Sequence, residues 1–210
     1  MNDRITSVSG KALNKAQRRR RDDIIEAALA VFDRDGFDGA RIDDVAAEAE
    51  VAKGTVYLYF KNKQALFEAM IEAVVGPAID AVERAASSSD STAAERLRLQ
   101  IRVIGERLGK GSMKSVLRLM ISEGPRHDEL RRYYYQRVVR PGMVAIRHSL
   151  EQGENSGEFR RGSASLHPQI FAGPALMAAV WRMLFDDMSP LDVESLLQEH
   201  LEIVLRGLRA

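Results

Sequence analysis

The sequence contains no cysteine. This absence excludes disulfide bonds, thiolate metal ligands and a cysteine nucleophile, and it suits a reducing compartment. The N-terminus is polar and basic, so it lacks the apolar segment of a secretory signal. We therefore expect a cytoplasmic protein.

Long apolar runs are also missing. The longest, from 170 to 185, is interrupted by Gly173, Pro174 and Arg182, and it is shorter than the roughly 20 residues that span a bilayer. We expect this segment to be a buried helix and the protein to have no membrane partner.

No stretch alternates apolar and polar residues in the manner of a half-buried strand, whereas apolar residues recur at helical spacing almost everywhere. The chain is therefore predicted to be all-α. In its second half we expect helices near 93–109, 113–123, 127–151, 167–186 and 190–208. Pro141 is expected to bend the third of these, and Ser189 with Pro190 to start the last.

Motifs of catalysis are absent as well. The sequence shows no signature of a catalytic serine, a phosphate-binding loop or a dinucleotide site. The histidines show no ligand-like spacing; they are His127, His148, His167 and His200. We predict no catalytic residue, no metal site and no cofactor, so an all-α enzyme for small molecules is the weakest functional hypothesis.

The net charge is only +1, but the charges are unevenly distributed. Residues 1–21 hold seven basic residues and one acidic residue, residues 22–50 hold two basic and ten acidic residues, and residues 53–63 hold three basic and none acidic. Two basic patches therefore flank an acidic segment. Such a run is usually a solvated face, but beside a DNA-binding motif it favours phosphate contacts.

Residues 41–63 have the pattern of two short helices joined by a tight turn. Ile42, Val45, Ala46 and Ala49 recur at helical spacing, and Val56, Tyr59 and Phe60 resume that spacing after Val51. Between Lys53 and Lys63 the chain holds three lysines, one threonine and two tyrosines, and no acidic residue. Such a face suits phosphates and base edges.

The segment KGTVYLYFKNK resembles, nearly residue for residue, the recognition helix of the TetR family of bacterial transcriptional regulators. The resemblance begins in DDIIEAALAVFDRDGF and ends near Leu66 and Phe67. It implies an N-terminal three-helix helix-turn-helix domain followed by an α-helical ligand-binding and dimerisation domain. It also implies a homodimer that represses transcription from a palindromic double-stranded DNA operator.

By this resemblance and by side-chain chemistry, we predict DNA contacts along the motif. Lys53 and Thr55 are assigned to base edges or nearby phosphates, Tyr57 and Lys63 to phosphates, and Tyr59 to either. Gly54 allows a close approach of the helix start to a phosphate. The further candidates are Arg18, Arg19, Arg20, Arg21 and Arg41.

The sequence departs from the family pattern in the turn. Glu50 and Ala52 stand where the family commonly has glycine and a capping serine, and Arg41 stands where it often has serine or threonine. Loss of a serine cap costs about 1 kcal/mol. The turn is therefore expected to be looser, without loss of a base-reading group.

We predict three regions: a disordered basic arm at 1–17, a DNA-binding domain at 18–63, and an effector-binding and dimerisation domain at 64–210. The first helix is expected to follow the arginine run and to end at Gly36, with Phe37 folding back onto it. Asn62 is expected to cap the fourth helix, which Gly76 and Pro77 kink or break. Thr92 and Glu95 form a capping box after the serine-rich loop at 87–91.

The resemblance also implies a cavity for a small apolar or aromatic effector. Methionine and aromatic side chains suit such a wall, although most residues of this kind form plain core. The candidates are Met113, Leu117, Met120, Tyr134, Arg137, Phe171, Met177 and Trp181, with Arg182 and His148 as further polar anchors.

The last two predicted helices carry apolar faces wider than one neighbour would bury. We predict that they form a two-fold dimer interface, with Trp181 lining either the cavity or the dimer seam. An architectural DNA-binding protein without effector is the alternative that would explain the basic patches, but it leaves more than 120 C-terminal residues without a role.

Overall fold

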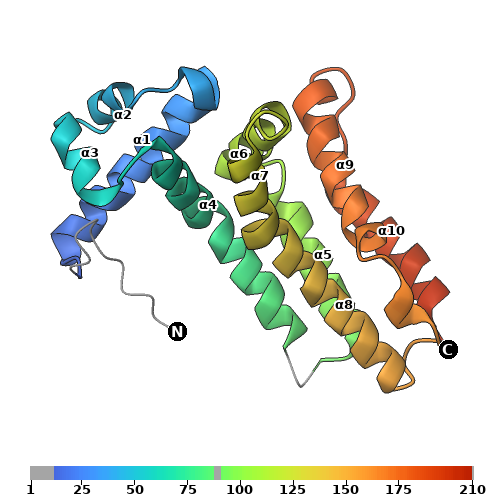
Figure 1. The fold of residues 1–210 in the computed structure, drawn as a ribbon. Coiled ribbons are helices and arrows are strands. Elements are labelled where there is room, and N and C mark those ends of the chain that lie inside the picture. Colours follow the sequence, from blue (N-terminus) through green and yellow to red (C-terminus); the bar gives the residue numbers. More distant parts are fainter. Residues whose placement is uncertain (1–11, 88–90, 210) are drawn as a thin grey trace. The chain divides into compact units, whose positions relative to one another are not determined.

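The computed structural model describes residues 12–87 and 91–209, and every regular element within these ranges is a helix (Figure 1). One isolated bridge joins Phe159 to Arg209. The prediction of an all-α protein is therefore confirmed. No helix among the described residues has both the length and the apolar character needed to cross a membrane.

The helices follow one another along the chain with short connections (Figure 1). Their bounds are α1 Lys15–Gly39, α2 Ile42–Glu48, α3 Lys53–Tyr59, α4 Lys63–Ala86, α5 Ala93–Arg107, α6 Gly111–Glu123, α7 Asp128–Tyr134, the π-helical η1 Tyr135–Val139, α8 Arg140–Asn155, the 3-10 turn η2 Ser163–Ser165, α9 Gln169–Phe185 and α10 Val193–Leu208.

Helix α1 begins earlier than predicted. Asn14 is its N-cap and accepts a hydrogen bond from the Gln17 backbone N–H at 2.9 Å. The four arginines at 18–21 therefore lie inside α1, not before it, and the last three residues of the predicted arm are helical. Residues 1–11 of that arm lie outside the described residues.

Two predicted caps are confirmed and one is wrong. The Ala65 N–H donates to Asn62 at 2.8 Å, and Thr92 with Glu95 forms the expected capping box. Helix α10, however, starts at Val193, where Asp192 accepts from the Ser195 N–H. A carboxylate at the N-cap satisfies this end directly, so Pro190 stays outside the helix.

Pro77 does not break the fourth helix, a break being one of the two outcomes that were predicted for it. Helix α4 continues through Pro77 as one element of 24 residues. Pro77 is exposed, while Val75 and Ala78 beside it are buried, so packing on both sides of the proline holds the helix together. Before Pro141, in contrast, the chain forms the π-helical segment η1.

The chain divides into two compact units, the first of which comprises residues 1–74 and 118–134. Its core is aromatic: the Phe32 and Phe37 rings stack with centroids 5.8 Å apart, and Phe67 meets both edge-on at 5.2 and 5.3 Å. Phe37 thus folds back onto α1, as predicted, because Gly36 breaks the helical path with φ 72° and ψ 178°.

The first unit includes more of the chain than the predicted domain at 18–63. The end of α6 and α7 belong to it: Arg118 donates to the Asp33 carbonyl at 3.0 Å, and the Tyr133 hydroxyl donates to the Glu68 carbonyl at 3.2 Å. Its boundary in α4 falls after Val74. Contacts between residues 65 to 85 positions apart in the chain define this boundary, and such contacts leave no local pattern.

The second unit comprises residues 75–117 and 135–210. Its core brings together apolar side chains of α5, α8, α9 and α10, including Leu97, Ile146, Phe171 and Leu205. A buried pair joins α5 to α8, where the Gln100 side-chain amide donates to Ser149 Oγ at 3.0 Å. The shared apolar core packs the last two long helices, α9 and α10, against α5.

Candidate functional site

Helices α2 and α3 form the predicted helix-turn-helix. Ile42 and Val45 of α2 and Val56 of α3 are buried, together with Phe60 just after α3. Within the turn, the Val51 N–H donates to the Ala46 carbonyl at 2.9 Å. The apolar spacing therefore fixes which face of α3 points inward, and its opposite face is left for a partner.

Glu50, at the centre of this turn, has a left-handed backbone with φ 52°. It is the one residue other than glycine with positive φ among the described residues. This conformation costs a residue with a Cβ roughly 1–2 kcal/mol. Glycine has no Cβ and avoids this cost, so it would suit this position. With glutamate here the turn still closes through the hydrogen bond from the Val51 N–H to the Ala46 carbonyl.

The outer face of α3 carries the predicted DNA contacts. Lys53 and Gly54 are exposed, Tyr57 is 44% exposed, and Thr55 and Tyr59 are half-buried. Lys53 Nζ donates to Asp43 Oδ2 at 2.9 Å, and this hydrogen bond with the attraction of the carboxylate raises the pKa of Lys53. A phosphate at this position would have to replace Asp43.

The arginine run separates into two kinds of side chain. Arg18, Arg19 and Arg20 are exposed in the first turns of α1. Arg21 lies 5.3 Å above the Phe60 ring, and partial burial lowers its pKa despite Asp22 nearby. Arg21 therefore packs α1 against the residue that ends α3, whereas the other three face solvent.

Lys63 is placed differently from the other predicted contacts. Its Nζ donates to the carbonyls of Phe37, Asp38 and Ala40 at 2.6, 3.2 and 3.1 Å. It also lies 4.7 Å from the centre of the Phe37 ring. Because an ammonium has three N–H donors, all of them are used within the fold. Arg41 is exposed and makes no side-chain cap to α2.

The predicted effector residues are divided between the two compact units and differ in burial. In the second unit, Met113, Leu117 and Phe171 are buried, whereas Arg137 is exposed on η1. In the first unit, Met120 is half-buried, and burial raises the pKa of Tyr134 to about 12.

The remaining two candidates, Met177 and Trp181, lie on the outer side of α9. Met177 is 45% exposed. The Trp181 indole N–H donates to the Ser189 carbonyl at 2.8 Å, and its ring meets Phe185 edge-on. A hydrogen bond to the loop after α9 holds this ring over the end of its own helix.

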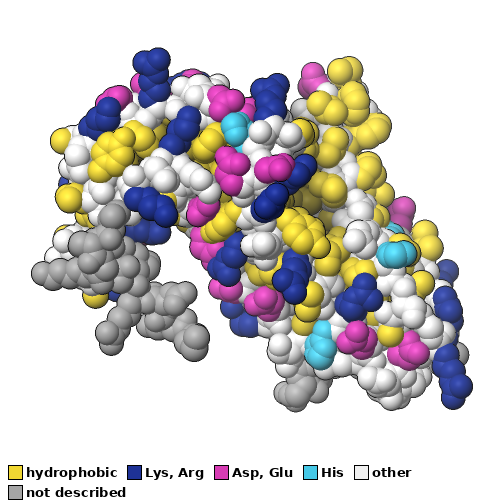
Figure 2. Space-filling model, in the orientation of Figure 1, with side chains coloured by type: hydrophobic (Ala, Val, Ile, Leu, Met, Phe, Trp, Pro, Cys, Tyr) yellow, Lys and Arg dark blue, Asp and Glu magenta, His cyan; other side chains and the backbone are white. Residues whose placement is uncertain are grey.

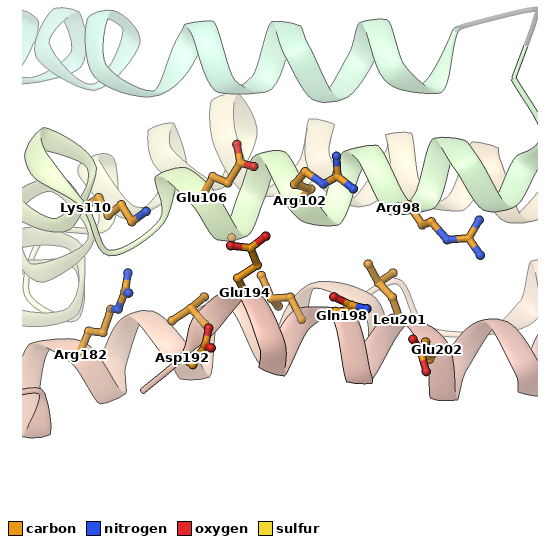
Figure 3. A pocket seen from close by; sticks show the side chains of 13 residues that line it. Arg98, Arg102, Glu106, Lys110, Arg182, Asp192, Glu194, Gln198, Leu201 and Glu202 are labelled. Atoms are coloured by element: carbon orange, nitrogen blue, oxygen red, sulfur yellow. The ribbon is translucent and has the colours of Figure 1, made fainter. Parts of the chain in front are cut away.

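A hollow of about 600 Å³ in the second unit lies between α5 and α10 and reaches Arg182 of α9. Figure 3 shows charged residues on both sides of it: Arg102 and Glu106 of α5 with Lys110 just after that helix, and Asp192 and Glu194 at the start of α10. Its wall is therefore mainly polar, and of the predicted effector candidates it contains only the further anchor Arg182.

Helices α9 and α10 leave apolar side chains exposed on their outer faces. Figure 2 shows hydrophobic side chains gathered over the end of α9. The exposed large residues on these helices and the loop between them are Ile170, Leu176, Met177, Leu184, Phe185, Met188 and Ile203. A shallow hollow among Ile170, Pro174, Met177, Leu196 and Ile203 joins the two faces.

Comparison with known families covers most of the chain. Residues 24–70 match the N-terminal domain of the bacterial regulatory proteins of the tetR family. Residues 95–207, more than half of the chain, match the C-terminal domain of AefR-like transcriptional repressors. The chain belongs to the TetR family. Both halves of this TetR-family regulator are thus recognised, and the helix-turn-helix lies within the first match.

Relatives of the regulator extend over nearly its whole length. The fatty acid metabolism regulator protein of Bacillus subtilis is 27% identical over 196 residues, which cover 92% of this chain and 98% of the relative. A crystal structure of the Bacillus subtilis regulator FadR in complex with stearoyl-CoA has a TM-score of 0.71 and 27% identity, covering 89% of this chain and 98% of that one.

The fold is also similar to that of proteins with lower sequence identity. SmeT, the repressor of the Stenotrophomonas maltophilia multidrug efflux pump SmeDEF, has a TM-score of 0.72 at 19% identity, with 90% of each chain covered. These comparisons support the predicted fold class and family of this chain. The individual contact residues stay predictions.

We expect Glu50→Gly to stabilise this TetR-family regulator. Glycine removes the left-handed strain of roughly 1–2 kcal/mol but adds about 0.5–1 kcal/mol of chain entropy to the unfolded state. The net gain should be on the order of 0.5–1 kcal/mol in the free energy of unfolding, measured with urea. In the control, Ala47→Gly in the exposed face of α2, stability should fall by about 1 kcal/mol. Equal losses in both variants would refute strain at Glu50.

Proposed function

We propose that this TetR-family protein is a cytoplasmic repressor that binds a palindromic operator as a homodimer and leaves it when a small apolar effector binds. The observation that carries the proposal is the exposed lysine and tyrosine face of α3, held on a buried helix-turn-helix within the family match. The regulators similar to it are not described as enzymes, and we assign no catalytic residue.

The proposed DNA contacts divide by chemistry. Lys53 and Thr55, near the start of α3, are closest in type to base-reading side chains. Tyr57, Tyr59, Arg41 and the exposed arginines of α1 supply donors for phosphates. Gly54 has no atom within 4 Å of the place where a Cβ would stand, so a phosphate can approach the backbone there.

The function is tested by selecting bound sequences from a random DNA pool. We expect an inverted repeat whose half-sites follow the two-fold symmetry of a dimer. The selected operator is then titrated with stearoyl-CoA and with coenzyme A alone. Release by the acylated compound only would support an apolar effector of the kind bound by the 27% identical relative. A pool without sequence enrichment would favour the architectural alternative.

The salt dependence of operator binding tests the arginines at the start of α1. Changing Arg18, Arg19 and Arg20 together to alanine should reduce the slope of log affinity against log salt by about 0.9 for each phosphate that these side chains neutralise. The free energy of unfolding should stay within about 0.5 kcal/mol, since these side chains are exposed. An unchanged slope would identify the run as a solvated face.

Lys63 is proposed to stabilise the fold and not to contact a phosphate. Lys63→Met keeps the apolar stem but removes the ammonium that binds three carbonyls at the end of α1. We expect a loss of about 2 kcal/mol in the free energy of unfolding. The matched variant Lys61→Met removes an exposed ammonium two residues away and should leave the free energy of unfolding within about 0.5 kcal/mol. Unchanged stability together with a lower salt slope in Lys63→Met would restore Lys63 to the DNA surface.

The outer faces of α9 and α10 are proposed as the dimer interface. Large apolar side chains are exposed on both helices, and patches of this kind mark association surfaces. Met177 and Trp181 belong to this outer stripe with Ile170 and Leu184, at helical spacing. We therefore assign these two residues to the seam, and we keep Met113, Leu117 and Phe171 as candidates for an effector site in the second unit.

Trp181 is the only tryptophan and reports on this interface. If it lies in the seam, its fluorescence should change when the protein is diluted through the range in which dimers dissociate. Addition of a releasing effector at constant dimer content should leave its emission nearly unchanged. Met177→Asp should shift the dilution curve to higher protein concentration, because the charge would be buried in an apolar interface. Emission that follows effector and not dilution would place Trp181 in the cavity.

A further inference from the structure

We propose that Asp38, Glu123 and His127 form a binding site for a divalent transition-metal ion. One ligand atom from each of these residues lies within 4.8 Å of the others. His127 Nε2 is 3.2 Å from Asp38 Oδ1 and 3.6 Å from Glu123 Oε2. All three residues belong to the first compact unit. The histidine spacing in the sequence predicted no such site, because the carboxylates come from 89 and 4 residues earlier in the chain.

The fold holds these three side chains from separate elements. Asp38 follows the break at Gly36 near the end of α1, Glu123 is the last residue of α6, and His127 directly precedes α7. The His127 ring meets the Phe37 ring at 4.9 Å, and its backbone N–H donates to the Glu123 carbonyl at 3.1 Å. The donors are therefore positioned by packing and backbone bonds, independently of any ion.

The spacing of the donor atoms fits four-coordinate geometry. Zinc binds imidazole nitrogen and carboxylate oxygen at about 2.0–2.2 Å in a tetrahedron, so two of its ligands stand roughly 3.3–3.5 Å apart. The two distances from His127 Nε2 lie on either side of this range. Three protein ligands leave the fourth position for water. An imidazole in the set favours zinc, cobalt or nickel over magnesium or calcium, which prefer oxygen.

Two of the proposed metal-ligand atoms are buried and have no hydrogen-bond partner among the described residues. Glu123 Oε2 and His127 Nε2 are both shielded from solvent and form no hydrogen bond within the described structure. A buried polar atom without a partner costs free energy. A metal ion would bind both atoms at once, and the Asp38 side chain, 68% exposed, leaves a path from solvent.

The competing interpretation is an ion pair, in which a protonated His127 compensates the two carboxylates. Glu129 also faces the ring, with Oε1 3.9 Å from Nδ1. In a metal site this carboxylate would orient the imidazole from the side away from the ion. The two interpretations differ in one measurable property, because only a metal site makes the stability of the protein depend on metal concentration.

The test uses the full-length protein without a polyhistidine tag. After treatment with a chelator, the protein is titrated with zinc chloride by calorimetry, and its thermal midpoint is recorded at increasing zinc concentration. An ion bound only by the folded state should raise the midpoint with concentration. The variants are Asp38→Asn, at an exposed position, and His127→Gln. His167→Gln is the matched control, because it removes an exposed histidine outside the cluster.

We expect one zinc ion per chain in the parent protein and in His167→Gln. Binding should be weakened at least tenfold in Asp38→Asn and be undetectable in His127→Gln, and the zinc-dependent rise in midpoint should disappear with it. Asp38→Asn keeps the test valid if His127→Gln folds poorly. Zinc binding that persists in both cluster variants would overturn the proposal. So would an absence of binding in the parent, which would identify the cluster as an ion pair only.

Discussion

The end of α1 is the point on which the DNA-binding unit depends. Gly36 turns the chain with a left-handed backbone, and Phe37 then folds beneath α1 to meet Phe32 and Phe67. The carbonyls exposed by this turn are bound by the Lys63 ammonium. Helix α1 has no basic residue in its own last turn, so a lysine from the start of α4 supplies the positive charge that its C-terminus favours.

This arrangement links the positions of four helices. The aromatic cluster joins α1 to α4, and Lys63 ties the start of α4 to the segment that leads into α2. Arg21 then connects α1 to Phe60 at the end of α3. Helix α3 has only seven residues, too few to be stable alone. Its orientation is therefore set by its neighbours, which bury Val56 and leave Lys53 and Tyr57 exposed.

The second unit leaves large apolar side chains of α9 and α10 exposed to solvent. Its core packs α9 and α10 against α5 and α8, but the outer stripe of α9 and α10 has no cover within the described chain. The hollow between α5 and α10 carries charges of both signs. The second unit thus has an apolar surface on α9 and α10 that suits association. It also has a charged hollow between α5 and α10 that suits solvent.

Sequence alone determined the local features of this protein. Helical periodicity, the capping residues Asn62 and Thr92, the break at Gly36 and the motif KGTVYLYFKNK all act over a few residues, so each is readable without a fold. These features also carried the family and the class of function. The apolar face of the last two helices was equally visible, because an excess of leucine at helical spacing needs no tertiary information.

Only the tertiary structure decided which polar side chains are free. Lys61 and Lys63 are lysines two positions apart, and nothing in the sequence distinguishes their roles. In the structure Lys63 binds the carbonyls of residues 37, 38 and 40, whereas Lys61 faces solvent. Arg21 differs from its three neighbours in the same way. Asp38, Glu123 and His127 meet because α6 and α7 pack beside the end of α1. Hydrogen bonds and charge contacts between residues distant in sequence depend on how helices pack, and helical periodicity specifies which face is buried but not which partner buries it.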